Sequence, residues 1–381
     1  MPHRLNLFPD LCLFLISMGL QTVMTRWVLE NPRWRTRSRV FLLALVNLLY
    51  FCASALAYLM SFNRTWRYLP ATLATWIQAS GMILTVTLTG FCMGMWVWRH
   101  LPPYQSRRRR FLQTAGTAIG VAPFVGTSFG ILVRNQFYLN EVDIKIPNLA
   151  KDLDGLRMVQ ITDIHLSPFL SERQFARAID MANETKAHLG LVTGDLITRA
   201  GDPLEACLRQ LTRLRAEAGV LGCLGNHERF AQVEDYVTQQ GRRIGIEFLR
   251  SHARQLRFGN AEINLAGVDY QVFHSAYLVG AETLVVPGQL NVLLSHNPDV
   301  FPIAAQKGFD LTIAGHTHGG QVNVEILHQN VNVARTFTPY VRGLYRQGSS
   351  AIHVSSGIGT IGVPVRVGAP PEVTLIRLCA S

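Results

Sequence analysis

The sequence that decides the fold of this chain is Gly315-His316-Thr317-His318-Gly319-Gly320-Gln321, which directly follows the apolar run 311–314. In an extended segment, side chains two residues apart point to the same side, so both imidazoles face one point. The flanking glycines allow a tight turn and leave space beside the imidazoles. Two histidines held in this way predict a metal site. Two ordinary surface histidines would give the same pattern, so the segments upstream decide between these interpretations.

Four upstream segments repeat this design, an apolar, β-like run that ends in side chains able to bind a metal. They span residues 156–165, 189–195, 220–228 and 290–298. In an open α/β sheet the carboxyl ends of the strands face one crevice, so five such strand ends place their polar residues around one pocket. The stretches between these motifs show helical spacing, at 172–187, 203–217 and 233–242. The order of strand, motif and helix predicts an α/β domain.

The five motifs run in the order Asp-x-His, Gly-Asp, Gly-Asn-His-Glu, His and Gly-His-x-His, from Asp163 to His318. In this order they resemble the motifs of the calcineurin-like metallophosphoesterase superfamily. Val-Ser-Ser-Gly-Ile-Gly at 354–359 and Pro-Glu-Val-Thr-Leu at 371–375 also resemble the membrane-attached bacterial branch of that superfamily. The resemblance extends from Tyr138 to the C-terminus. It implies a layered β-sandwich flanked by helices, and a metal-dependent phosphoric ester hydrolase that acts on phosphodiesters or pyrophosphates.

The resemblance also implies two divalent metal ions, which together lower the pKa of a bridging water and hold the phosphoryl oxygens. Asp195 is the expected bridge, because a carboxylate has two oxygens and a negative charge to offset adjacent cations. The remaining ligands are Asp163, His165 and His318 for the first ion, and Asn226, His296 and His316 for the second. This mixture of nitrogen and oxygen ligands suits manganese, iron or zinc better than calcium or magnesium.

Four further residues are assigned to the substrate or to its surroundings. His227 resembles the phosphate-contacting histidine of the superfamily that assists the leaving group, and an imidazole can act as a general acid near physiological pH. Glu228, at a position where the superfamily often has Asp, is predicted to orient His227. Arg199 and Arg229 follow two of the motifs and are within reach of a substrate phosphate, although solvated arginines would give the same pattern.

Three apolar runs, at 5–29, 40–60 and 69–98, precede this part of the chain. Each exceeds the roughly 20 residues that a membrane-spanning helix needs, and aromatic residues lie near their ends, as in an interfacial belt. A fourth run, 111–133, is weaker because it contains glycines and a proline. It follows Arg108-Arg109-x-Phe-Leu, which resembles a twin-arginine export signal. A plain positive-inside anchor explains these residues equally well.

The positive charge belongs to the N-terminal part of the chain. Residues 1–136 contain 14 Lys and Arg against 2 Asp and Glu, whereas residues 137–381 contain 22 against 23. Arginines between apolar runs predict loops at the cytoplasmic face of a membrane, and no nucleic-acid partner is expected. With cytoplasmic loops at 33–39 and 99–110, four spans place the rest of the chain outside the cytoplasm. Arg64 and Arg67, in the intervening loop, depart from this rule.

We therefore predict a transmembrane region at 1–134, a tether with a first strand at 135–152, and a catalytic domain at 153–381. The expected protein is a multi-pass enzyme of the inner (cytoplasmic) membrane with an extracytoplasmic catalytic domain and a phosphoester substrate that is lipid-linked or part of the cell envelope. Two alternatives stay open. One is an enzyme similar to the UDP-diacylglucosamine pyrophosphatases of lipid A synthesis, whose substrate is cytoplasmic. The other is a non-catalytic binding or scaffold protein on the same fold.

Overall fold

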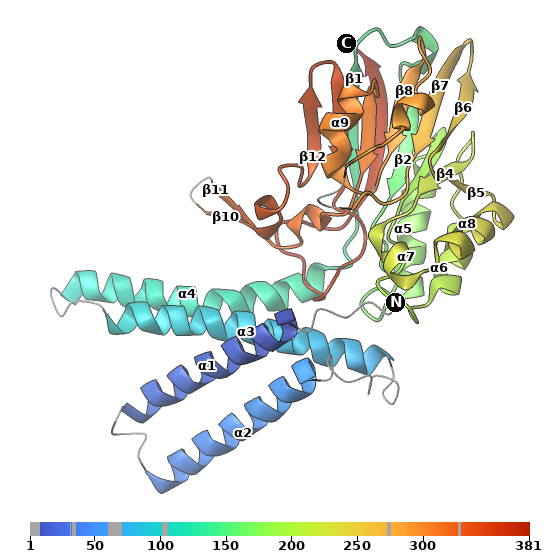
Figure 1. Cartoon of the computed structure of the whole chain (residues 1–381). Helices are drawn as coiled ribbons and strands as arrows, with labels where there is room; N and C mark the ends of the chain where they lie inside the picture. The colour runs from blue at the N-terminus through green and yellow to red at the C-terminus, as the bar shows by residue number, and fades with distance from the viewer. Residues whose placement is uncertain are drawn as a thin grey trace. The chain divides into compact units, whose positions relative to one another are not determined.

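The computed structural model describes residues 8–30, 32, 36–59, 71–100, 106–272, 276–326 and 329–381. It consists of two compact units, one formed by Met1–Ile131 with Gly362–Pro364, and the other by Leu132–Ile361 with Val365–Ser381 (Figure 1). The predictions that concern Arg33, Arg35, Arg64 and Arg67 lie outside the described residues.

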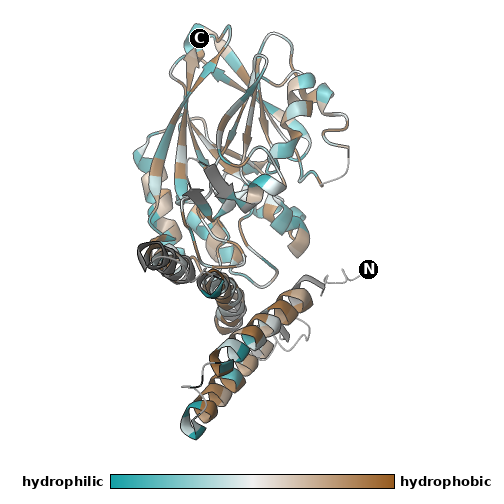
Figure 2. Cartoon of the chain, turned by 90° about the vertical axis from the view of Figure 1, so that its left-hand side faces the viewer, coloured by the Kyte–Doolittle hydropathy of each residue, from teal (hydrophilic) through white to brown (hydrophobic). Residues whose placement is uncertain are grey.

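The N-terminal part of the chain forms long helices, α1 (Phe8–Glu30), α2 (Arg37–Leu59), α3 (Ala71–Arg99) and α4 (Ser106–Val133). Among the described residues, three stretches are long and apolar enough to cross a membrane: Leu11–Glu30, Arg37–Ala55 and Ala79–Val97. Figure 2 shows long brown, apolar stretches on those of these helices that are seen from the side, whereas the α/β unit has mixed colouring. The three predicted apolar helices are confirmed. The fourth run forms one continuous helix, α4, and its crossing of a membrane stays a prediction.

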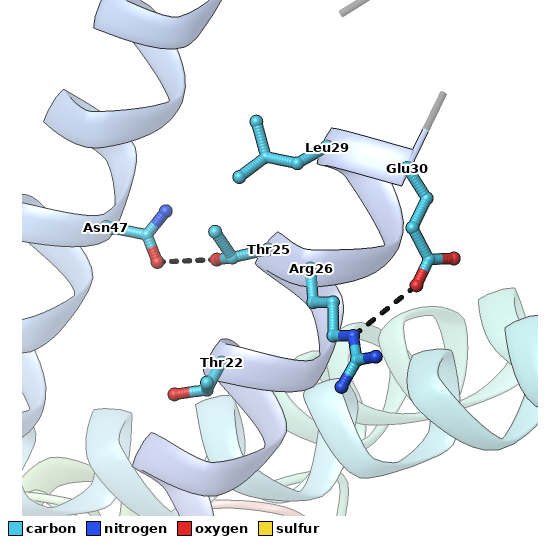
Figure 3. A pocket seen from close by; sticks show the side chains of 6 residues that line it. All are labelled: Thr22, Thr25, Arg26, Leu29, Glu30 and Asn47. Atoms are coloured by element: carbon cyan, nitrogen blue, oxygen red, sulfur yellow. Dashed lines mark hydrogen bonds and ion pairs between the residues drawn. The ribbon is translucent and has the colours of Figure 1, made fainter. Parts of the chain in front are cut away.

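Polar side chains join α1 to α2. The Nε2 of Gln21 donates a hydrogen bond to the Oδ1 of Asn47 at 3.0 Å. The hydroxyl of Thr25 donates to the same oxygen at 2.7 Å, as Figure 3 shows. Arg26 and Glu30, one turn apart at the end of α1, form an ion pair at 3.5 Å. Hydrogen bonds of this kind stabilise helix packing in apolar surroundings, where the hydrophobic effect contributes little between helices.

The α/β unit contains two six-stranded sheets, in the orders β1-β14-β2-β3-β4-β5 and β12-β13-β9-β8-β7-β6, and a hairpin of β10 and β11. The strands of the first sheet are β1 (Tyr138–Ile146), β2 (Arg157–Ile161), β3 (Leu189–Thr193), β4 (Val220–Cys223), β5 (Ile246–Phe248) and β14 (Glu372–Ala380). Those of the second are β6 (His252–Phe258), β7 (Ala261–Gly267), β8 (Leu290–Leu294), β9 (Leu311–Ala314), β12 (Gly343–Gln347) and β13 (Ser350–Val354). The hairpin consists of β10 (Asn323–Ile326) and β11 (Gln329–Asn332).

One apolar core lies between the two sheets, and others lie on their outer faces. In β3, Leu189 and Leu191 pack toward the second sheet, whereas Val192 packs against the helices on the outer face. Both faces are therefore buried, which explains why the strand has a continuous apolar sequence. The helices beside the sheets are α5 (Glu172–Glu184), α6 (Leu204–Leu211), α7 (Asn226–Ala231), α8 (Glu234–Arg243) and α9 (Phe301–Gln306). The predicted layered β-sandwich flanked by helices is confirmed.

The strand directions bring the polar motifs to one edge of the sandwich. Strands β2, β3 and β4 are parallel in the first sheet, and β7, β8, β9 and β13 are parallel in the second. We call the edge where these strands end the carboxyl edge and the other end the opposite edge. Strand β14 runs antiparallel to β2, and β1 runs parallel to β14, so that Tyr138 pairs with Glu372 at the carboxyl edge. The chain therefore enters the α/β unit at this edge.

Candidate metal centre

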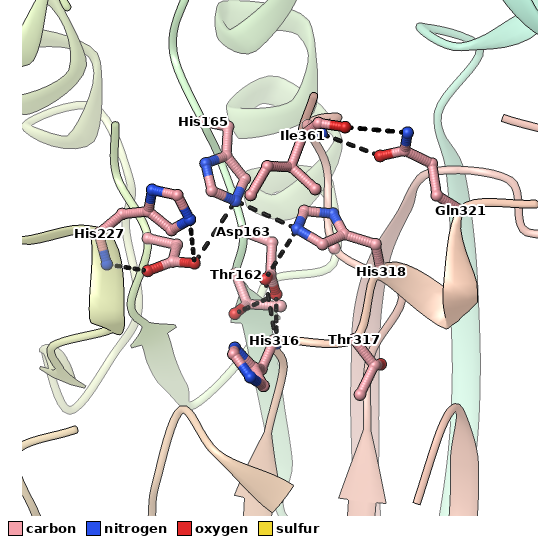
Figure 4. Close-up of polar contacts among 12 residues, drawn as sticks. Thr162, Asp163, His165, His227, His316, Thr317, His318, Gln321 and Ile361 are labelled. Carbon is pink, nitrogen blue, oxygen red and sulfur yellow. Dashed lines mark hydrogen bonds and ion pairs between the residues drawn. The ribbon is translucent and has the colours of Figure 1, made fainter. Parts of the chain in front are cut away.

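The structure brings all seven predicted ligands to the carboxyl edge. They follow β2 (Asp163, His165), β3 (Asp195), β4 (Asn226), β8 (His296) and β9 (His316, His318). Six of them are buried, and His316 is partly buried. Among the described residues, His and Asp side chains form three groups of three whose ligand atoms lie within 4.8 Å of one another: Asp163 with His165 and His318, Asp195 with His296 and His316, and His165 with Asp195 and His227. Figure 4 shows several of these side chains converging from different strands. The first two groups consist of residues from the two predicted ligand sets, and the third contains His227, which was predicted as a proton donor; the assignment of ligands to two ions stays a prediction.

Asp195 lies between the first two groups. Its Oδ2 is 3.4 Å from the Nε2 of His165 and 3.0 Å from the Nε2 of His296. Its Oδ1 accepts a hydrogen bond from the backbone N–H of His227 at 3.0 Å, which fixes the orientation of the carboxylate. One carboxylate oxygen thus faces a histidine of each group. This is the position that a ligand shared by two cations would need.

The donor atoms fit a metal. Within the part of the chain that the structure describes, the Oδ1 of Asn226 is buried without a hydrogen-bond partner. An unsatisfied buried acceptor costs about 1–3 kcal/mol, and a cation would remove this cost. The Nδ1 of His296 donates to the carbonyl of Thr193 at 2.7 Å, which directs its Nε2 toward Asp195. Metal-binding histidines are usually held in this way by a hydrogen bond from the second ring nitrogen.

Burial controls the ionisation of the histidines. It lowers the pKa of His165 and of His316 to about 3, and lowers the pKa of His318 well below its ordinary value. These three imidazoles are therefore neutral at pH 7, the form that binds metals. His296 differs: burial is the largest single effect and lowers its pKa, but the charge and hydrogen bond of Asp195, the charge of Asp163 and the carbonyl of Thr193 together outweigh burial and raise the pKa to about 10. His296 is therefore protonated at pH 7, and its positive charge occupies the place beside Asp195 that a metal cation would take.

The pKa values of the two buried aspartates are shifted in opposite directions. Burial raises the pKa of Asp163 to about 6. Burial also acts to raise the pKa of Asp195, but His296 and the neighbouring histidines hold it well below its ordinary value. Asp195 is therefore ionised at pH 7 and attracts cations.

The backbone of the site is strained. Five of the seven predicted ligands have φ between 45° and 76°: Asp163, His165, Asp195, His316 and His318. This left-handed conformation is uncommon for residues other than glycine and costs on the order of 1–3 kcal/mol each, and such strain clusters at functional sites. The glycines of the motifs make room for the carboxylates: a Cβ on Gly315 would collide with Asp163, and one on Gly225 would collide with Asp195.

His227 lies beside the cluster with one ring nitrogen held by the backbone. Its Nδ1 donates to the carbonyl of Thr198, and its Nε2 is 4.0 Å from the Oδ2 of Asp195. Its ring stands perpendicular to that of His165, with centroids 4.7 Å apart. The Nε2 of His227 thus lies beside the cluster of predicted ligands, and its role as a proton donor stays a prediction.

Glu228 makes contacts that the sequence did not predict. Its carboxylate is fully buried and accepts hydrogen bonds from the backbone N–H groups of Gly225, Asp195 and Leu196, at 2.7–2.9 Å. Glu228 therefore orients the loops that carry Asp195 and Asn226, and the carbonyl of Thr198 orients the ring of His227. The predicted orienting residue thus acts on the backbone of the site. The side chain of Glu228, one methylene longer than an aspartate, contacts both the loop of Asp195 and the loop of Gly225.

The two arginines predicted to contact substrate differ in their surroundings. The guanidinium of Arg199 lies 3.9 Å from Asp202, and the carboxylate of Asp202 also accepts the backbone N–H of Arg199 at 3.0 Å. Arg229 is exposed on α7, two residues after His227. Contact of either side chain with a substrate stays a prediction.

Arg366 is a site residue that the motifs do not include. It is the largest fully buried side chain among the described residues. Its guanidinium donates to the carbonyls of Ser356, Gly359 and His318, at 2.8, 3.1 and 3.4 Å. The backbone N–H of Gly359 in turn donates to the carbonyl of Asp163 at 2.7 Å. Arg366 therefore ties the C-terminal loop to the segments that carry two of the predicted ligands.

Tyr270 is a second residue outside the motifs. It follows β7, and its ring centroid lies 5.7 Å from that of His316 and 6.3 Å from that of His296. The signal in the sequence is weak, because β7 leads into Val-Asp-Tyr, which contains no metal-binding pattern. Tyr270 covers one side of the second predicted group of ligands.

Residues 156–320 match the family model of the calcineurin-like phosphoesterases. The chain carries a calcineurin-like phosphoesterase domain. It is 29% identical over 245 residues to an uncharacterised metallophosphoesterase of Campylobacter jejuni, with 63% of each chain covered. It is 31% identical over 260 residues to a transmembrane protein with a metallophosphoesterase domain of Danio rerio, covering 62% of this chain and 56% of that protein. It is 26% identical over 280 residues to the phosphodiesterase YaeI of Escherichia coli, covering 71% and 98%.

These similarities confirm the predicted superfamily. The matched region spans less than two thirds of the length of the Campylobacter and Danio relatives. The family match and the clustered histidines and aspartates are those of a calcineurin-like domain whose side chains are suited to divalent metal. The apolar helices and the transmembrane relatives indicate association with a membrane.

Proposed function

We propose that this chain is a membrane-anchored hydrolase of phosphodiester or pyrophosphate bonds that uses two divalent metal ions. The observation that carries the proposal is the position of Asp195, whose Oδ2 faces a histidine of each ligand group. One ion would be held by Asp163, His165, His318 and Asp195, and the other by Asn226, His296, His316 and Asp195. Manganese, iron or zinc suits these nitrogen and oxygen donors.

Two such ions, when bound, supply the positive charge that acidifies a water molecule and stabilises the phosphoryl oxygens. The side chains around them have separate tasks. His227, oriented by the carbonyl of Thr198, presents its Nε2 to the cluster and donates a proton to the leaving oxygen. Glu228 holds the backbone of Asp195 and of Gly225, so the two ligand loops keep their spacing. Arg229, exposed on α7 two residues after His227, is assigned to contact with the phosphate.

The direct test is hydrolysis of bis-p-nitrophenyl phosphate by the full chain in detergent micelles. We expect release of p-nitrophenol that requires added manganese and stops on chelation. A folded chain that binds manganese and releases no product would contradict the proposal. That result would favour the non-catalytic scaffold.

We also propose that the physiological substrate is a phosphoester of a membrane lipid or of the cell envelope. In this proposal the chain is a multi-pass protein of the inner membrane, and its catalytic domain lies on the extracytoplasmic side. The support is the apolar N-terminal part with its arginine-rich segments. A reporter that is active only outside the cytoplasm, fused after Ser381, should be active. Activity of only a cytoplasmic reporter would contradict this topology and favour a pyrophosphatase that acts on a nucleotide-linked lipid.

The export route is a separate part of this proposal. Changing Arg108→Lys and Arg109→Lys together keeps the charge but removes the twin-arginine pattern. If export uses that pattern, the same reporter falls silent in the double variant. If a positive-inside anchor is sufficient, the reporter stays active.

A further inference from the structure

The path of the chain determines which edge of the phosphoesterase domain is tethered. Helix α4 ends at Val133 and β1 begins at Tyr138, so four residues link them. Four extended residues reach at most about 14 Å. Tyr138 pairs with Glu372, and Thr374 of the same strand pairs with Gln160, the residue before the last of β2. The link therefore joins the domain at the carboxyl edge, where the ligand cluster lies.

Helix α4 exposes apolar side chains up to its last turn. Phe129 is 56% exposed and Leu132 is 76% exposed. Water disfavours such surface and lipid accepts it. This holds for a helix that crosses the bilayer and for one that lies in its interface. In both cases the start of the link, and with it the carboxyl edge of the domain, is held next to lipid.

An exposed phenylalanine and an exposed arginine lie on one side of the ligand cluster. Phe230 is 62% exposed, and its ring centroid lies 5.6 Å from that of His227. Arg229 precedes it on α7 and is also exposed. Both residues therefore lie at the carboxyl edge.

A second exposed phenylalanine and a second exposed arginine lie near His318, on the other side of the ligand cluster. Phe337 is 72% exposed and follows the short helix η7 (Val333–Thr336), in which Arg335 is exposed. This segment is joined to η6 (His318–Gly320) by a hydrogen bond of 2.9 Å from the side chain of Asn332 to the carbonyl of Gly319. Phe337 therefore also lies on a segment attached to the metal-binding loops.

We infer that the carboxyl edge docks on the bilayer surface through Phe230 and Phe337, with Arg229 and Arg335 against anionic headgroups. Aromatic rings and arginines are the side chains that gather at a membrane interface and at anionic lipids. Single exposed apolar residues are common on soluble proteins. Here, however, both phenylalanines lie at the edge that a four-residue link attaches to α4, whose last turns expose apolar side chains. The ligand cluster then opens toward the headgroup layer, so the substrate is a phosphoester that lies in or at that layer.

The test is photocrosslinking of the full chain in nanodiscs that contain phosphatidylglycerol and phosphatidylethanolamine. p-Benzoylphenylalanine is introduced at position 230, at position 337, or at position 257 as the matched control. Arg257 is comparably exposed, with 72% of its side chain accessible, but lies on β6 at the opposite edge. We expect several-fold more lipid adduct, detected by mass spectrometry, at 230 and 337 than at 257. Equal yields at the three positions, or adducts with protein alone at 337, would overturn the inference.

A second measurement uses the unmodified chain, so it does not depend on the folding of any variant. Hydrogen exchange in residues 226–231 and 333–338 should be slower in nanodiscs than in amphipol, whereas exchange in 252–262 should be the same in both. No slowing in the first two segments would contradict the docking surface. Neither measurement requires catalysis. A chain that gives the lipid adducts but does not hydrolyse bis-p-nitrophenyl phosphate would refute the proposed function alone.

Discussion

The two edges of the β-sandwich use left-handed backbone in different ways. At the opposite edge, such conformations just before β2, β4, β7, β8 and β9 fall on Gly155, Gly219, Gly259, Gly288 and Gly308. Glycine adopts them at little steric cost. At the carboxyl edge, aspartates and histidines adopt them instead. The opposite edge thus uses glycine at most of these turns, with Asn148 and Lys186 as non-glycine exceptions, whereas the carboxyl edge places the strained conformation on five predicted ligands.

The carboxylates of the two edges also have different roles. At the opposite edge, Asp310 accepts the backbone N–H of Asn291 at 2.8 Å, and Asp154 accepts that of Ala380 at 2.9 Å. These carboxylates stabilise turns. At the carboxyl edge, Asp163 and Asp195 are fully surrounded by protein and face imidazoles. Charges buried in this way need a cation, and this difference separates a structural edge from a reactive one.

The largest expected effect at the carboxyl edge is that of Asp195→Asn. The neutral amide cannot offset two adjacent cations, so nearly all hydrolysis of bis-p-nitrophenyl phosphate should be lost. Circular dichroism of the metal-free variant should match that of the unmodified chain. Retention of more than about a tenth of the activity would show that Asp195 is not the shared ligand.

His227→Ala should separate proton transfer from metal binding. Because the Nε2 of His227 faces the cluster but belongs to neither predicted ligand set, both ions should stay bound, as measured by elemental analysis. Turnover should fall by about 10²–10⁴-fold, the usual cost of a lost general acid, and less for substrates with good leaving groups. Loss of metal from this variant would mean that His227 is a ligand.

Arg366→Met tests how far the C-terminal loop positions the first group of ligands. Removing the guanidinium frees the carbonyls of His318 and Gly359, and losses of this kind typically weaken metal binding by about 10–100-fold. Arg366→Lys keeps the charge without the planar fork and should be intermediate. Calorimetric titration with manganese should show that only one of two sites is weakened. Equal weakening of both sites, or none, would contradict a positioning role at His318.

The smallest effect is expected at the opposite edge. Asp310→Asn weakens one hydrogen bond to a backbone N–H, and unfolding in denaturant should show a loss of about 1 kcal/mol in the free energy of unfolding. Hydrolysis should be unchanged. A large loss of activity would mean that the two edges are not independent in the way that their contacts indicate.

The sequence predicts which residues converge at the carboxyl edge because each predicted ligand follows a strand with a strong local pattern. Asp163, Asp195 and His296 could be placed by counting from apolar runs alone. Arg366 could not, because its partners are backbone carbonyls up to 48 residues away and an isolated arginine between valines has no pattern. The backbone contacts of Glu228 were missed for the same reason. They depend on how two loops approach each other in space.

The fold shows the same division between local and long-range information. The N-terminal helices, α5, α6, α8 and the strands that end in motifs were predicted, whereas α7, α9 and the hairpin of β6 and β7 were not. Strand β6 is an edge strand with mostly partly buried or exposed side chains, so it lacks a clear alternation of apolar residues. The entry of the chain at the carboxyl edge depends on β14 lying antiparallel between β1 and β2. Sheet order of this kind is set by contacts between residues 138 and 372, more than 200 positions apart.

The measurement that tests the central claim most directly is a titration of the metal-stripped full chain with manganese, with bound metal and hydrolysis of bis-p-nitrophenyl phosphate recorded together. If the carboxyl edge is a dinuclear centre bridged by Asp195, activity should return and reach its plateau at two bound ions per chain. The Asp195→Asn variant should show no comparable return. Full activity at one bound ion, or two bound ions without hydrolysis, would contradict the account.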